Sequence, residues 1–177
     1  MRRNAEVKTF VKCLGYTLGV IVVLVLGMLV LGRFADGPLE IIPGGPFESG
    51  EVASQEPDWS FAKDYGTVEF QLLDPAASRT TWLAVHDGRV FIPSGYMTTW
   101  WGKIWKQWPL QAEKDGRTIL RVDGKLYDRM LVRVMGGPEI DPVIAELGRK
   151  YGGGAPFPRE AFDSGYLWIF ELVPRGS

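Results

Sequence analysis

Apolar and polar residues divide the chain into three stretches of different character. Residues 13–32 hold no charged side chain over 20 positions, which is the length that a helix needs to cross the hydrocarbon core of a membrane. Residues 34–58 are rich in Gly, Pro and acidic residues without a sustained period, so we expect an extended linker there. From about residue 59 onward apolar residues alternate with polar ones, a pattern typical of half-buried β-strands.

The alternating region predicts a series of strands. Strand-like alternation falls at residues 67–73, 79–95, 117–135 and 165–172. The second and third of these stretches each contain an Asp-Gly pair, at 87–88 and at 123–124, and this dipeptide strongly favours a two-residue hairpin turn. Consecutive hairpins with short connections predict an antiparallel sheet that closes toward a small barrel.

Two stretches with helical spacing interrupt the strands. In DPVIAELGRKYGG, from residue 141, Asp141 is expected to cap a helix and Pro142 to take its first position. The other stretch is YMTTWWGKIWKQWPLQ, residues 96–111, which holds four of the seven tryptophans. Its residues Trp101, Ile104, Trp105 and Trp108 are spaced i, i+3, i+4 and i+7. We expect this stripe to pack on the core of the barrel and Pro109 to end the helix.

The charges that flank the apolar run predict its orientation in a membrane. Basic residues dominate before it and acidic residues after it: Arg2, Arg3, Lys8 and Lys12 precede, and Asp36, Glu40, Glu48 and Glu51 follow. The positive-inside rule then places the N-terminus in the cytoplasm and the later residues outside it. We therefore predict a single-pass protein of a bacterial inner membrane with a periplasmic domain.

A cleaved signal peptide is the alternative interpretation of this run. The run is longer than the usual apolar segment of such peptides, about 7–15 residues, and no clear A-x-A site follows it. These features favour an uncleaved anchor. The expected organisation is a cytoplasmic N-terminus at 1–12, a transmembrane helix at 13–32, a linker at 33–58 and a folded domain at 59–174. The final LVPRGS, 172–177, matches a thrombin-cleavage sequence, so at least residues 175–177 are treated as an expression-tag remnant.

Composition and charge exclude several classes of function. The formal net charge is −1, so no overall field attracts nucleic acid, and no nucleic-acid partner is expected. One cysteine, Cys13, excludes an internal disulfide, and one histidine, His86, argues against a zinc site. No G-x-S-x-G turn is present, which argues against a hydrolase triad. No catalytic residue and no metal ligand is predicted.

Several strings resemble split-barrel oxidoreductases, in particular the deazaflavin (F420)-dependent nitroreductases, which are relatives of the FMN-binding split barrels. SRTTWLAVHDGRVFIPSG (78–95) resembles the arginine-bearing strand and hairpin of that family, and PVIAELGRKYG (142–152) resembles its last helix. The tryptophan-rich stretch and the strands after it, residues 100–134, resemble the intervening helix, corner and strand pair. The resemblance, which covers about residues 65–172, implies a mainly antiparallel split β-barrel with two or three helices. With the transmembrane helix expected at 13–32, the predicted fold class is α+β, in which a single N-terminal transmembrane helix precedes the split barrel.

The phosphate-binding turn of that family is the main departure. The family has a G-R-K-S-G-like turn before the arginine strand, whereas this chain reads DPAAS at 74–78. Asp74 repels phosphate, and Pro75 lacks an amide donor. Ser78 and Arg79 match the end of the motif. Whether FMN or F420 binds is therefore left open, with Ser78, Arg79, Lys103 and Lys106 as the candidate cofactor-binding residues.

Four aromatic residues are candidates for contact with a ligand or partner: Tyr96, Trp100, Trp101 and Trp105. Exposed aromatics beside a membrane anchor can enter the bilayer interface, stack on a ring-shaped ligand or contact another protein. The alternatives are a buried core face for the tryptophans and a solvated face for the two lysines.

Three functions are consistent with these residues. In the first, the domain is an accessory or ligand-binding subunit, with a membrane protein or a second copy as its partner. In the second, which the resemblance implies, it is a flavin- or deazaflavin-dependent oxidoreductase that acts on a quinone-like or nitroaromatic acceptor. In the third, it carries a lipid or another apolar ligand. The loss of the phosphate-binding turn favours the first, and whether the chain is an enzyme is left open.

Overall fold

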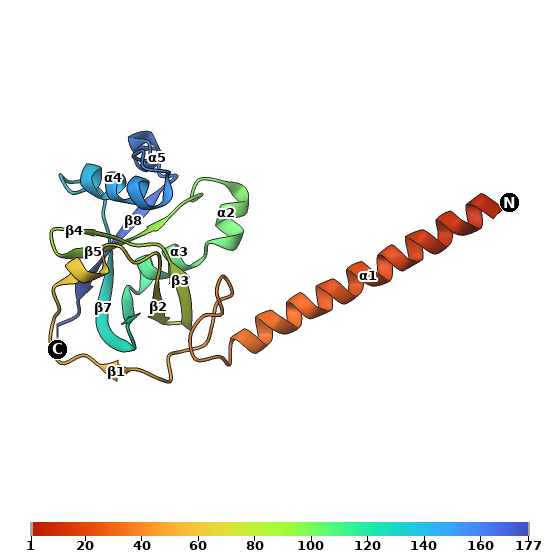
Figure 1. The fold of residues 1–177 in the computed structure, drawn as a ribbon, viewed down its shortest axis with the longest axis horizontal. Helices are drawn as coiled ribbons and strands as arrows, with labels where there is room; N and C mark the ends of the chain where they lie inside the picture. Colours follow the sequence, from red (N-terminus) through yellow and green to blue (C-terminus); the bar gives the residue numbers. More distant parts are fainter. Residues whose placement is uncertain (1, 177) are drawn as a thin grey trace.

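A long apolar helix projects from a folded domain in the computed structural model, which describes residues 2–176 (Figure 1). This helix, α1 (Arg2–Gly32), contains the candidate membrane span Phe10–Gly32, which has a mean hydropathy of 2.6 and is not buried inside the protein. A helix of this length and composition is able to span a membrane, although signal sequences share these properties.

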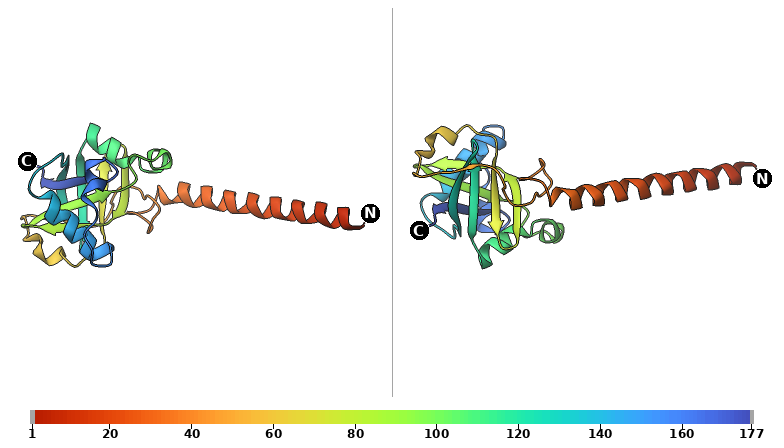
Figure 2. Two further views of the ribbon diagram at one scale, coloured as in Figure 1. Left: turned by 90° about the horizontal axis from the view of Figure 1, so that it is seen from above. Right: turned by 90° about the horizontal axis from the view of Figure 1, so that it is seen from below.

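The domain is built on one curved, mainly antiparallel sheet that forms a half-barrel. Its strands are β1 (Glu51–Val52), β2 (Val68–Leu73), β3 (Ala76–Thr81), β4 (Ala84–His86), β5 (Arg89–Ser94), β6 (Arg117–Val122), β7 (Lys125–Arg133) and β8 (Trp168–Pro174). Seven of them follow the order β3-β2-β6-β7-β8-β5-β4, and β1 adds to β7 in parallel. Figure 2 shows the strands wrapped into this half-barrel from two sides. The predicted α+β class is confirmed.

The two Asp-Gly hairpins form as predicted. Asp87 and Gly88 have φ angles of 48° and 69°, and Asp123 and Gly124 have 51° and 72°. Two successive positive φ angles are the requirement of the tight turn that matches the twist of paired strands. One strand boundary differs from the prediction, because residues 79–81 belong to β3, which pairs with β2 and not with β4. The DPAAS segment therefore forms the β2–β3 hairpin.

The helices depart from the prediction around the tryptophans. The expected single helix is divided into α2 (Trp100–Trp105) and α3 (Trp108–Lys114), and Pro109 lies in the first turn of α3. Proline suits a first turn because the amide that it lacks has no partner there. Further along lie α4 (Ile140–Tyr151) and α5 (Arg159–Asp163), and a short 3-10 turn, η1 (Trp59–Ala62), precedes the sheet. Glu139, and not Asp141, is the N-cap residue of α4.

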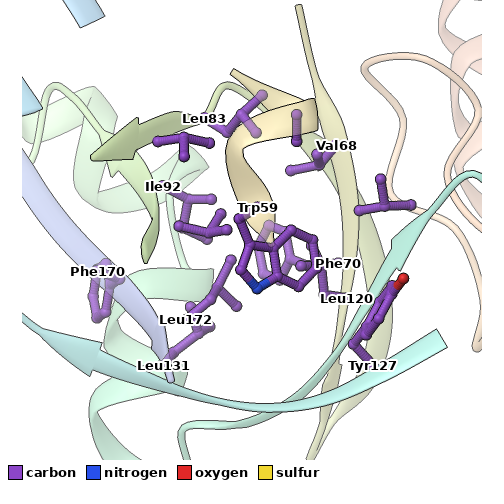
Figure 3. Packing of buried hydrophobic residues seen from close by; sticks show 14 of the residues in the cluster. Trp59, Val68, Phe70, Leu83, Ile92, Leu120, Tyr127, Leu131, Phe170 and Leu172 are labelled. Atoms are coloured by element: carbon purple, nitrogen blue, oxygen red, sulfur yellow. The ribbon is translucent and has the colours of Figure 1, made fainter. Parts of the chain in front are cut away.

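The core of the half-barrel is closed at one end by Trp108. Its ring centroid lies 5.0 Å from that of Phe70 and 5.2 Å from that of Phe170. Figure 3 shows the apolar side chains of the strands converging around Trp59. A second apolar cluster packs α4 against β4, β5 and β8.

The predicted core stripe of tryptophans is wrong except for Trp108. Trp101, Ile104 and Trp105 are 43%, 70% and 69% exposed, whereas Trp108 is 6% exposed. The break between α2 and α3 separates the two groups, because a continuous helix is needed to keep residues i and i+7 on one face. The first three side chains therefore point away from the core.

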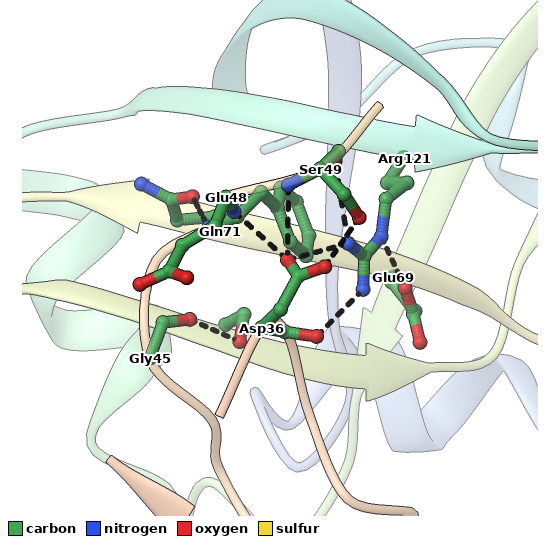
Figure 4. Close-up of polar contacts among 9 residues, drawn as sticks. Asp36, Gly45, Glu48, Ser49, Glu69, Gln71 and Arg121 are labelled. Atoms are coloured by element: carbon green, nitrogen blue, oxygen red, sulfur yellow. Dashed lines mark hydrogen bonds and ion pairs between the residues drawn. The ribbon is translucent and has the colours of Figure 1, made fainter. Parts of the chain in front are cut away.

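The linker after α1 lies along the sheet. Gly44 forms an isolated backbone bridge with Ser78, and the Ser78 hydroxyl donates to the Gly45 carbonyl at 2.6 Å. Asp36 accepts hydrogen bonds from the Glu48 amide at 2.8 Å and from Arg121 Nη1 at 2.9 Å (Figure 4). We call residues 33–52 the linker strap. The strap holds the end of α1 against the domain. An unstructured linker would leave the position of α1 relative to the domain free.

Candidate functional site

A groove with a volume of about 730 Å³ lies where the ends of β3 and β5 meet the C-terminal helices. Volumes of a few hundred to about 1,000 Å³ are usual for small-molecule sites. Most of its large side chains are aromatic, and we call it the aromatic groove. Its principal lining residues are Trp82, Tyr96, Lys106, Tyr151, Phe157 and Tyr166.

One wall of the aromatic groove is a stacked pair of rings. Trp82 lies on Tyr151 with ring centroids 4.5 Å apart and an interplanar angle of 6°. The Tyr151 hydroxyl accepts from the Leu83 amide at 3.1 Å and donates to the Gly66 carbonyl at 2.7 Å. These bonds join the end of α4 to the loops after β3 and before β2. The wall is therefore fixed before any ligand binds, which reduces the ordering cost of binding.

The opposite wall is built around Tyr96, whose ring lies 5.1 Å from that of Tyr166 and 4.6 Å from that of Trp101. Tyr96 has a φ angle of 67°, a left-handed conformation that is unfavourable for a bulky residue. Its carbonyl accepts hydrogen bonds from the amide and the hydroxyl of Thr99, at 3.1 and 2.8 Å. These contacts hold the strained residue in place, and strain of this kind is concentrated at functional sites.

Lys106 is the charged residue of the aromatic groove. It is partly buried, and among the described residues no acceptor lies within hydrogen-bond distance of its ammonium group. Burial lowers the pKa of Lys106 below its ordinary value. A half-buried cation without a counter-ion is unfavourable by itself, and an anionic group in the groove would relieve this cost.

A second cavity of similar volume lies under the linker strap, and the cation among its described lining residues, Arg121, is already paired. Arg121 Nε donates to Glu69 at 2.7 Å, and Arg121 Nη1 donates to Asp36 at 2.9 Å. Hydrogen bonds from Ser49 and from the Glu48 amide, with Arg121 nearby, hold the pKa of Asp36 well below its usual range. This network fastens the strap, and the remaining described charges of the lining, on Glu40 and Asp123, are negative, so the cavity offers no free cation to an anionic ligand. The described residues contain no cluster of acidic, histidine or cysteine side chains that could hold a metal ion.

The structure does not bring Ser78 and Arg79 into the aromatic groove. Ser78 is fully buried beneath the linker strap. Arg79 lines a separate cavity between β3 and the end of α1. There its pKa is lowered to about 10, first by burial and then by the charge of Arg33. Of the four candidate cofactor-binding residues, Lys106 lines the groove. Lys103 is exposed on α2 and does not line it.

Of the four aromatic candidates, Tyr96 lines the aromatic groove, and Trp100, Trp101 and Trp105 lie on the exposed side of α2. Sequence reasoning missed the other groove residues, Trp82, Tyr151, Phe157 and Tyr166. They come from segments that are far apart in the chain and meet only in the fold. The available signal was weak: each is an aromatic residue close to the end of a strand or helix.

Comparisons with known proteins give distant structural neighbours, two of which are described here. No family model and no curated protein matches the sequence. The conserved hypothetical protein Rv2991 from Mycobacterium tuberculosis aligns with a TM-score of 0.47 and 16% identity, over 74% of this chain and 86% of that one. A candidate pyridoxamine 5'-phosphate oxidase from Listeria innocua aligns with a TM-score of 0.41 and 15% identity, over 63% of this chain and 86% of that one.

Proposed function

We propose that this chain is a membrane-tethered ligand-binding domain whose aromatic groove holds a flat, apolar ring that carries a negative charge. One observation carries the proposal: Lys106, without a counter-ion, lies in a groove walled by aromatic rings. Aromatic walls favour a planar ligand through stacking and apolar contact. The lysine supplies one charge-assisted contact that orients it.

The lining of the groove favours binding over catalysis. Its described residues include hydroxyls, aromatic rings and one lysine, and neither a carboxylate nor an imidazole. The single histidine, His86, lies beside the Asp87-Gly88 turn with its Nε2 3.3 Å from Asp87 and does not line the groove. General acid–base chemistry usually relies on such groups. We therefore assign the domain an accessory or ligand-binding role within a membrane assembly, with a membrane protein or a second copy as partner.

A flavin or deazaflavin fits this groove only in part. The aromatic walls suit the ring system, and Lys106 suits an anionic group. The residues expected to hold the phosphate, Ser78 and Arg79, lie outside the groove, and the Ser78 hydroxyl is already bonded to the Gly45 carbonyl. No redox step is therefore derived, and oxidoreductase activity remains the second candidate because the groove accepts a ring of this type.

The ligand is tested by titrating the purified full chain with three planar probes: FMN, F420 and menadione. We expect quenching of tryptophan fluorescence by an anionic probe, because Trp82 and the neighbouring tyrosines line the groove. Lys106→Met should weaken that binding by about tenfold, which is about 1.4 kcal/mol and the lower end for a charge-assisted contact. The matched control is Lys103→Met on α2, three residues before Lys106, because the exposed Lys103 side chain lies outside the groove.

The affinity should also depend on pH through Lys106. The ammonium is protonated below its pKa, so anion binding should persist at neutral pH and weaken as pH rises through a value below the usual 10.5. Lys106→Arg, which stays charged, should remove this dependence. Equal affinity in Lys106→Met and the native chain would contradict the proposed site. Reduction of an acceptor by protein loaded with the reduced flavin or deazaflavin, with the cofactor oxidised in return, would establish the oxidoreductase alternative.

The tether belongs to the same proposal. α1 would cross a bacterial inner membrane with its basic N-terminus in the cytoplasm and the domain in the periplasm. Protease added to spheroplasts should then degrade the domain and leave a short fragment that contains α1. Full protection of the domain in intact spheroplasts would contradict this orientation.

A further inference from the structure

The outer side of α2 is a surface of large apolar side chains, which we call the α2 ridge: Trp100, Trp101, Ile104 and Trp105. Trp100 is 76% exposed, and Ile104 and Trp105 are about as exposed. The four side chains surround a shallow hollow with almost no polar surface. Exposing so much contiguous apolar area to water is unfavourable, so a ridge of this kind marks a contact surface.

The ridge lies on the side of the domain from which α1 departs. Figure 1 shows α2 on the flank that faces α1, and both views of Figure 2 place it beside the start of that helix. α1, whose apolar side chains are exposed, extends away from the domain on this side. A membrane that surrounds α1 therefore has its surface close to the α2 ridge.

The linker strap keeps the ridge in this position. Gly44 and Ser78 bridge the strap to β3, and Asp36 joins it to Arg121 of β6. At the helix end, the Gly32 backbone packs closely against Ile42 and Pro43 of the strap. Because these contacts begin directly after α1, the domain has little freedom to turn the ridge away from the membrane.

We propose that the α2 ridge docks into the interface of the bilayer that α1 would span, on a leaflet that contains anionic lipid; this inference rests on the tether proposed above. Tryptophan favours the headgroup level of a membrane, where its ring is apolar and its N–H is hydrated. Four side chains are also too few for a stable protein–protein interface, which needs about 20–30 residues a side. The bilayer is therefore the occupant that both composition and size favour.

The preference for anionic lipid comes from free cations on this side of the protein. Lys103 lies on α2 beside the ridge, and Arg33 follows α1 directly. Among the described residues neither side chain has a carboxylate within ion-pair distance, and both are exposed. Unpaired lysine and arginine at a membrane surface are attracted to anionic headgroups.

Tryptophan fluorescence tests the docking in the full chain, because α1 contains no tryptophan. The chain is reconstituted in vesicles of phosphatidylcholine and phosphatidylglycerol whose acyl chains are brominated. We expect the lipid bromines to quench part of the emission, at most the share of Trp100, Trp101 and Trp105, which are three of the seven tryptophans. Ile104→Asp, which keeps every tryptophan, should abolish this quenching.

The matched control is Met135→Asp, which introduces the same charge at another exposed apolar residue and should leave quenching unchanged. Flotation after carbonate washing shows that α1 is inserted, which separates a failure of docking from a failure of the tether. Emission that the lipid bromines do not quench in the native chain would overturn the proposal. If the tryptophans of the ridge were then also protected from acrylamide, the ridge would be covered by protein, which in these vesicles means a second copy of the chain. Equal quenching with phosphatidylcholine alone would overturn the preference for anionic lipid.

Discussion

At the scale of single residues, Arg129 shows how a charge is accommodated in the core. It is 1% exposed, and its Nη2 donates to the Glu56 carboxylate at 2.6 Å. Its guanidinium lies 5.1 Å from the ring of Trp59, whose Nε1 donates to the same carboxylate at 2.6 Å. One linker carboxylate therefore neutralises a core arginine and positions a core tryptophan.

Replacing Glu56 with alanine should destabilise the domain by about 2 kcal/mol. Removal of one partner of a buried ion pair typically costs about 3–5 kcal/mol, and the partial exposure of Glu56 reduces this value. Urea unfolding of the full chain in detergent measures the change. Glu51→Ala, an exposed linker carboxylate, should alter the free energy of unfolding by less than about 0.5 kcal/mol. Similar midpoints for both variants would show that Arg129 does not need Glu56.

At the scale of elements, α2 depends on a close approach between its backbone and the preceding turn. The Thr99 hydroxyl caps the helix by accepting from the Gly102 amide at 3.0 Å. A Cβ atom at Gly102 would lie 1.9 Å from the Tyr96 carbonyl oxygen and 2.6 Å from the Thr99 hydroxyl. Glycine is therefore required where α2 folds back on the residue that forms one wall of the aromatic groove.

Gly102→Ala should lower the free energy of unfolding by about 1–3 kcal/mol, because the added methyl group displaces backbone atoms. It should also change the near-ultraviolet dichroism of the tryptophans, since α2 carries three of them. Gly66→Ala is the control, because no atom lies within 4 Å of the position of its Cβ. An unchanged spectrum and an unchanged free energy of unfolding in Gly102→Ala would show that α2 accommodates the added methyl group and that glycine is not required there.

At the scale of the whole molecule, the linker strap joins the apolar helix to the domain. It crosses β2, β3 and β6 through a few polar contacts, of which Asp36 with Ser49 and Arg121 is the centre. The two Asp-Gly hairpins of the sheet lie outside this strap, whereas its last residues form β1, which pairs with β7. The position of α1 relative to the groove and to α2 depends on the strap.

The strap should loosen in acid. Because folding lowers the pKa of Asp36, its contribution to stability is fully present above the unfolded value of about 4 and declines as pH falls below it. The protection factors of the Glu48 and Ser49 amides, which donate to Asp36, should fall as pH drops below about 4. In Asp36→Asn, which has no carboxylate to titrate, the protection factors should be lower and independent of pH over this range. Protection of these two amides that does not change with pH in the native chain would contradict this role of Asp36.

The local sequence determined much of the sheet. The Asp-Gly pairs required positive φ angles, and the period of two identified the side chains of β2 that enter the core. In β7 the same period was misleading, because Tyr127 and Leu131 are buried and Val132 is exposed. The length and apolarity of residues 13–32 predicted a single long helix, and α1 contains it. These features depend on residues close together in the chain, so short-range rules were sufficient.

The site needed the tertiary structure, for a physical reason. Helical spacing describes a face correctly only while the helix continues, and the break after α2 turned an expected core stripe into an exposed ridge. The aromatic groove joins Trp82, Tyr96, Tyr151 and Tyr166, which no local period connects. Likewise, the burial of Ser78 results from a strap about 33 residues earlier in the chain. Contacts between distant segments decide which polar and aromatic groups remain free, and the sequence alone determined only which groups were present.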